Sequence, residues 1–145
     1  MLGHIYYIIG LFVLVTILTH LSKFKKIQSV IEWVDKFKNV TGKQPQKEDY
    51  RSKEELNLFL GISILAVIEF IWTICGLVTS SWYIFLSLFI YSIIIRLIIK
   101  PIKFTLFGKI MILHFIIVKF LVYLYLIINH FHLHYDTLSI IKSYL

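Results

Sequence analysis

The chain has 145 residues, of which 59% are hydrophobic and 17% aromatic, and its mean hydropathy is +0.83. A soluble domain of this length could not hide so much apolar surface, because too many of its residues would face water. The formal charge of +7 does not indicate a nucleic-acid partner, since the basic residues gather in two connections between apolar runs. We therefore predict an all-α integral membrane protein with four transmembrane helices in an antiparallel bundle.

Residues 2–21 are the first predicted span, because their length suits a helix that crosses a bilayer. No basic segment precedes the run and no small-residue cleavage site follows it, so we do not interpret it as a cleavable signal peptide. Lys23, Lys25 and Lys26 come directly after it. They place this end on the cytoplasmic or matrix side and leave the N-terminus outside.

Residues 22–55 form the predicted inner polar loop, with nine Lys or Arg and six Asp or Glu. Gly42 is expected to end a helix, and Ser52 with Glu55 reads as a capping box that starts the next helix near Lys53. The apolar residues of the first half of the loop recur at a helical spacing, which predicts an amphipathic helix; they are Phe24, Ile27, Val30, Ile31, Val34 and Phe37.

The second and third predicted spans, 56–79 and 82–99, are joined by a very short uncharged turn and should form a helical hairpin. Pro101 is expected to stop the third span at the inner surface. The fourth span covers 105–128. Counting the loop charges predicts that both termini lie outside. We expect the membrane to be a bacterial inner membrane or an organellar inner membrane.

The outer tail, residues 129–145, completes what we interpret as a single membrane domain. Asp136 or Thr137 is expected to cap a short C-terminal helix there.

Glu69 is the only carboxylate within the four predicted spans. It lies on a stripe of small and polar residues whose spacing of 3, 4, 3 and 4 puts them on one helix face, a predicted helix-packing face: Ala66, Glu69, Thr73, Gly76 and Ser80.

Depth in the bilayer suggests a partner for this carboxylate. At ~1.5 Å of rise per residue, Glu69 lies ~15 Å and Lys119 ~14 Å from the outer ends of their spans, whereas Arg96 lies ~21 Å from the outer end of its span. We therefore expect Glu69 to pair with Lys119, while Arg96 extends toward the basic inner surface. The alternative is a pair between Glu69 and Arg96.

His130, His132 and His134 alternate in the outer tail. Three imidazoles could bind a metal ion, but Asp136 is the only other metal-ligating residue nearby. We interpret them as polar aromatic residues at the membrane interface, and we expect neither a metal nor a cofactor. A haem is also not expected, because the other histidines do not lie at matching depths on facing spans: His4, His20 and His114.

The sequence contains no GxSxG, HExxH, CxxC, P-loop or GxGxxG motif, so we do not expect an enzyme. It predicts a small accessory or structural subunit, with the lipid bilayer and other membrane subunits as partners and docking through its spans and the inner amphipathic helix. One alternative is a homo-oligomeric pore, since small basic multi-span proteins of the holin sort resemble the chain in size and charge. A second alternative is an ion-pathway, proton-pathway or redox subunit. It is disfavoured because His114 lies about 140° around the helix from Lys119.

Overall fold

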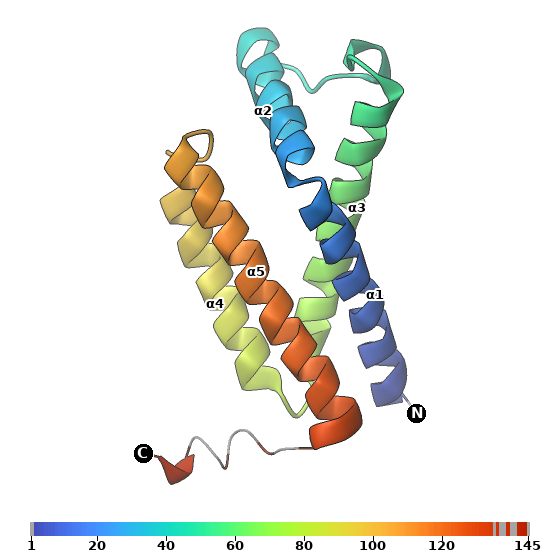
Figure 1. Ribbon diagram of the computed structural model, residues 1–145, viewed down its shortest axis with the longest axis vertical. Helices are drawn as coiled ribbons and strands as arrows, with labels where there is room; N and C mark the ends of the chain where they lie inside the picture. The colour runs from blue at the N-terminus through green and yellow to red at the C-terminus, as the bar shows by residue number, and fades with distance from the viewer. Residues whose placement is uncertain (1, 135, 137–138, 140–141, 145) are drawn as a thin grey trace.

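The computed structural model describes residues 2–134, 136, 139 and 142–144. These residues form five α-helices and no strands (Figure 1). A short 3₁₀ turn, Lys47–Asp49, precedes the third helix, and one π-helical turn, Asn129–Leu133, follows the fifth. The α-helices are α1 (Leu2–Ser22), α2 (Phe24–Thr41), α3 (Lys53–Gly76), α4 (Trp82–Ile99) and α5 (Leu106–Ile128).

Four of the described helical segments are long and apolar enough to cross a membrane. Their mean hydropathies lie between 2.0 and 2.4, and they correspond to α1, α3, α4 and α5 with its π-helical extension. The prediction of an all-helical, multi-pass membrane protein is confirmed at this level. The expected short helix of the C-terminal tail depends on Thr137, Leu138 and Ile141, which lie outside the described residues.

The helices are arranged as two groups that meet at one end (Figure 1). α1 continues into α2, and α3 runs back beside them; α4 and α5 lie side by side as a second group. The groups approach each other where the N-terminus and the α3–α4 turn lie, which we call the converging end. They separate where α2 and the α4–α5 connection lie, which we call the divergent end.

Local sequence explains where several helices begin and end. The Ser52 hydroxyl accepts a hydrogen bond from the Glu55 amide at 3.2 Å and caps α3, although the Glu55 carboxylate pairs with Arg51 rather than reaching back. Gly42 ends α2 with φ +70°, in the left-handed region where a side chain is strained. α4 ends at Ile99, before Pro101.

α3 ends at Gly76, three residues before its predicted end at residue 79. A Cβ atom at Gly76 would lie 2.5 Å from the Phe85 ring, so the helices approach there more closely than any other residue permits. The Thr79 hydroxyl then donates to the Gly76 carbonyl at 2.7 Å and satisfies a helix-terminal acceptor. Ser80 therefore lies in the turn, and its predicted place on the packing face of this helix is wrong.

An aromatic cluster from four helices fills the converging end. Trp72 is 2% exposed, and its indole N–H donates to the Tyr6 carbonyl at 3.0 Å while the Tyr6 hydroxyl donates to the Trp72 carbonyl at 2.8 Å. Its ring stacks on Tyr6 and meets Phe85 and Tyr123 edge-on, with centroid separations between 4.9 and 5.2 Å. These contacts bind α1, α3, α4 and α5 to one another. We call Tyr6, Trp72, Phe85 and Tyr123 the aromatic cluster.

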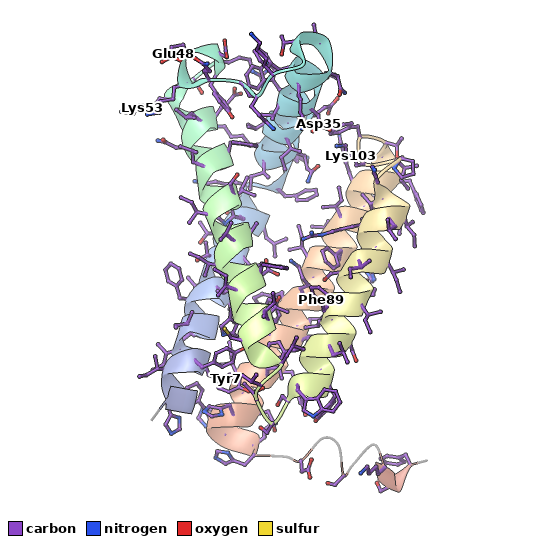
Figure 2. All side chains as sticks on the ribbon, turned by 180° about the vertical axis from the view of Figure 1, so that it is seen from behind. Tyr7, Asp35, Glu48, Lys53, Phe89 and Lys103 are labelled. Atoms are coloured by element: carbon purple, nitrogen blue, oxygen red, sulfur yellow. The ribbon has the colours of Figure 1, made fainter. Side chains whose placement is uncertain are left out.

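Ion pairs connect α2 to its neighbours at the divergent end. Lys26 lies 2.5 Å from Glu54 at the start of α3. Lys103 pairs with Asp35, and Figure 2 shows these two residues facing each other from α2 and the α4–α5 connection. Lys109 of α5 lies 3.5 Å from Glu32. α2 also buries three apolar side chains within the chain, those of Ile27, Val30 and Val34.

Candidate functional site

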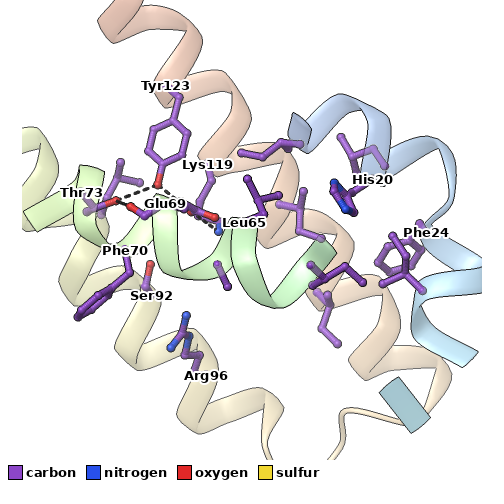
Figure 3. Close-up of a pocket in the computed structure, with 18 of the residues that line it drawn as sticks. His20, Phe24, Leu65, Glu69, Phe70, Thr73, Ser92, Arg96, Lys119 and Tyr123 are labelled. Atoms are coloured by element: carbon purple, nitrogen blue, oxygen red, sulfur yellow. Dashed lines mark hydrogen bonds and ion pairs between the residues drawn. The ribbon is translucent and has the colours of Figure 1, made fainter. Parts of the chain in front are cut away.

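Glu69 and Lys119 form an ion pair between α3 and α5, at a separation of 2.5 Å (Figure 3). Both side chains are largely buried, with exposed fractions of 15% for Glu69 and 14% for Lys119. The Tyr123 hydroxyl donates to the same carboxylate oxygen at 2.8 Å. The Thr73 hydroxyl lies 3.2 Å from the Tyr123 hydroxyl and donates to the Glu69 carbonyl at 2.8 Å. We call Glu69, Thr73, Lys119 and Tyr123 the polar cluster.

Helical spacing brings these four groups together. Glu69 and Thr73 are four residues apart on α3, and Lys119 and Tyr123 are four residues apart on α5, so each pair shares one helix face. A charge without a partner at this depth costs at least about 2.5–3.5 kcal/mol. Two donors on one carboxylate oxygen offset that cost, and they fix the position of α3 against α5.

A central cavity of about 290 Å³ lies between the two helix groups (Figure 3). Much of its lining is apolar and comes from α1 to α5. The polar cluster forms part of its wall. The remaining polar lining residues are His20, Gln28, Ser92 and Arg96.

Arg96 lines the same cavity but does not reach Glu69. Among the described residues, its guanidinium has no ion-pair or hydrogen-bond partner. Figure 3 shows it on the same wall of the cavity as Ser92, directed into the cavity and not away toward the end of α4. Arg96 is an exposed residue, and its side chain is not directed toward the basic end of α4 as expected.

The other predicted packing residues divide between two environments. Thr73 and Gly76 are buried where helices meet, whereas Ala66 is exposed and lines the cavity. Ser80 lines a smaller pocket of about 210 Å³ at the converging end, together with Ser81, Asn129 and His130. One stripe thus serves both for packing and for cavity lining.

The three tail histidines lie in different surroundings. His130 stacks on Tyr7 with a centroid separation of 4.0 Å, and its Nε2 lies 3.1 Å from Nδ1 of His4. His132 and His134 are exposed. Within the part of the chain that the structure describes, no group of three or more His, Cys, Asp or Glu side chains is placed to hold a metal ion.

Sequence analysis missed part of this site. It did not predict that Tyr123 donates to Glu69, or that Gln28 and His20 lie beside the same space. The four-residue spacing from Lys119 to Tyr123 was a usable signal for a shared carboxylate partner. Gln28 and His20 carried no such signal, since their position depends on how α1 and α2 meet the other helices.

Four apolar helices of spanning length, with a buried ion pair between two of them, define a multi-pass helical membrane protein. Comparison of the chain with protein-family models, curated proteins and solved structures found no match. The functional interpretation therefore depends on the geometry of the chain itself.

Proposed function

We propose that the chain is a non-enzymatic accessory subunit of a larger membrane assembly. The proposal depends on one observation. The Glu69 carboxylate forms an ion pair with Lys119 at 2.5 Å and accepts a hydrogen bond from the Tyr123 hydroxyl at 2.8 Å. A carboxylate held in this way stabilises a helix arrangement and is not available as a reactive group. The protein then offers a stable surface of exposed apolar side chains on its spanning helices to lipid and to neighbouring subunits.

The distribution of charge supports an orientation for this subunit. The divergent end carries α2, the linker after it and the α4–α5 connection, and nearly all the Lys and Arg lie there. Under the positive-inside rule this end faces the cytoplasm or matrix, both termini lie outside, and the spans alternate in direction as an antiparallel bundle. A bacterial inner membrane or an organellar inner membrane fits that orientation.

α2 supports docking through its charged surface. Its apolar residues Ile27, Val30 and Val34 are buried within the chain, which leaves Lys25 and Lys38 among the exposed residues. An amphipathic helix used in this way binds its own bundle through one face and presents positive charge to a partner through the other. The partner surface that matches it is acidic.

Native purification tests the proposal. The tagged chain is extracted in mild detergent at its natural expression level, and the mass of the intact complex is measured. We expect other membrane proteins in fixed stoichiometry with it. A monodisperse particle with the mass of the chain alone would contradict the proposal.

Glu69→Gln separates an internal role of the acid from a docking role. If the acid acts internally, the isolated variant is less stable but still binds its partners. If the acid docks a neighbouring subunit, the complex dissociates while the isolated chain keeps its stability. The second result would contradict the role proposed for Glu69.

A proton-pathway subunit is the second candidate, because Glu69, Tyr123 and Thr73 form a continuous hydrogen-bond chain beside a cavity. Proton flux into liposomes that is lost in Glu69→Gln would favour it. A holin-like pore draws less support, since the aromatic cluster fills the space between the helices at the converging end.

A further inference from the structure

The central cavity carries more hydrogen-bond donors than the chain satisfies. Gln28 is only 7% exposed and lines the cavity, yet among the described residues no hydrogen bond holds its side-chain amide. The Ser92 hydroxyl and the Arg96 guanidinium line the cavity and are likewise without a partner in that part of the chain. Three polar side chains on two helices therefore face one space without an acceptor from the protein.

The charge of the cavity is also unbalanced. Its lining contains one acid, Glu69, and that acid is already taken by Lys119 and Tyr123. The positive charge of Arg96 therefore has no acid to balance it among the residues that line the cavity. A ligand with anionic oxygens matches this surplus, because a guanidinium binds phosphate through two parallel hydrogen bonds.

The position of Arg96 indicates where such an anion comes from. Arg96 lies in the last turn of α4, three residues before the helix ends at Ile99, or ~4.5 Å along the axis. With α4 spanning the bilayer as proposed, this position lies near the level at which lipid headgroups meet the hydrocarbon region. Lys100, one helical turn further, adds a second positive charge on the same side of the chain.

The rest of the cavity suits hydrocarbon. Apolar side chains dominate its remaining wall, including Phe70, Leu88, Phe89 and Ile116. A volume of about 290 Å³ is at the lower end for small-ligand pockets. It is too small for a partner helix, whose diameter with side chains is about 10–12 Å.

We propose that the central cavity binds the phosphate headgroup and adjoining hydrocarbon of an anionic membrane lipid, with Arg96 as the anchor of the phosphate. Gln28 and Ser92 donate further hydrogen bonds to the phosphate oxygens, and the lipid chains follow the apolar wall toward the bilayer. The site does not depend on a protein partner, so it can be tested on the isolated chain.

Native mass spectrometry of the purified full chain tests this site. The delipidated protein is titrated in separate series with phosphatidylglycerol, phosphatidylcholine of the same chain length, and inorganic phosphate. We expect phosphatidylglycerol to bind with one tight site and the other two to bind at least about tenfold more weakly, because the quaternary ammonium of phosphatidylcholine brings a like charge beside Arg96 and inorganic phosphate lacks the hydrocarbon. Equal binding of the two lipids, or equally tight binding of inorganic phosphate, would overturn the proposal.

Arg96→Gln and Arg51→Gln provide a matched pair, since these are the only two arginines of the chain. Arg51 lies just before α3, where it pairs with Glu55 away from the cavity. We expect Arg96→Gln to weaken phosphatidylglycerol binding at least about tenfold and Arg51→Gln to leave it unchanged. The same dissociation constant in both variants would overturn the assignment.

Gln28→Leu keeps the test valid if Arg96→Gln does not fold, as judged by helix content and a monodisperse elution profile. This variant removes a donor but no charge, so we expect a several-fold loss of phosphatidylglycerol binding. Unchanged binding in Gln28→Leu, or displacement of the lipid by a copurifying acidic protein, would contradict a lipid site in this cavity.

Discussion

The two ends of the molecule are held together by different interactions. At the converging end, Trp72 is 2% exposed and packs against aromatic rings from three other helices. At the divergent end, α2 reaches the second helix group through ion pairs such as Lys103 with Asp35, whose exposed fractions are 37% and 31%. The polar cluster lies between these ends, where close packing gives way to the cavity.

The two ends therefore differ in how easily their helices can separate. Aromatic packing requires one fixed geometry, whereas ion pairs between partly exposed side chains contribute only about 0–1 kcal/mol each. The divergent end can therefore separate at little cost while the converging end stays packed. A ligand could enter the cavity without disturbing the aromatic cluster.

Trp72→Ala should have the largest effect, because it removes the centre of the aromatic cluster and the indole hydrogen bond to Tyr6. We expect a loss of about 3–5 kcal/mol in the free energy of unfolding. Denaturation in mixed micelles measures it. Trp82→Ala is the control, since Trp82 is 48% exposed and should change stability by less than about 0.5 kcal/mol. Equal losses in both variants would refute the packed converging end.

Lys119→Met should rank second, because it leaves the Glu69 carboxylate with only the Tyr123 hydroxyl as a donor. We expect a loss of about 2.5–3.5 kcal/mol, the cost of an uncompensated charge in a span. The same denaturation assay measures it, with Lys142→Met in the C-terminal tail as the control. A loss below about 0.5 kcal/mol would show that the pair does not stabilise the bundle.

Asp35→Asn should cost only about 0–1 kcal/mol, since it breaks a partly exposed ion pair with Lys103. The informative measurement is the separation of α2 from the α4–α5 connection, obtained from spin labels at exposed positions of both. We expect a longer distance in the variant and no change at the converging end. An unchanged distance at the divergent end would argue against α2 being held there by ion pairs.

The smallest effect concerns pH and Glu32. A hydrogen bond from Lys36 and the positive charges of Lys36 and Lys109 lower the pKa of this carboxyl. Because the folded-state pKa lies below the unfolded-state value, the stabilisation is complete above the unfolded-state pKa and is lost as the pH falls through the lowered one. Thermal denaturation as a function of pH should show this acid-side loss in the wild type but not in Glu32→Gln. Identical acid profiles would show that Glu32 does not cause the loss of stability at acid pH.

Much of the fold follows from local sequence. Runs of apolar residues predict the four spans, and the Ser52 cap and Gly42 predict helix ends that the structure contains. Counting residues from the outer ends points to Lys119 as the partner of Glu69, and these are the two groups in contact. The rise per residue of a helix is constant, so the number of residues from the end of a span is enough to predict how deep a side chain lies.

The remainder depends on contacts between distant segments. The Phe85 ring of the next helix lies against Gly76 too closely for a side chain there, and no periodicity in α3 indicates that neighbour. The direction of Arg96 depends on a cavity bounded by all five helices. In the sequence, Gln28 is one polar residue of an amphipathic helix. Its place beside the cavity follows only from the packing of the other helices.

The most direct test of the account is a double-mutant cycle on Glu69→Gln and Lys119→Met, with the free energy of unfolding measured for the wild type, both single variants and the double variant. If the pair is satisfied within the chain, the double variant is more stable than the sum of the two losses predicts, with a coupling energy of about 1–3 kcal/mol. Additive losses, with no coupling energy, would show that Glu69 and Lys119 do not stabilise the bundle through each other and would contradict the account.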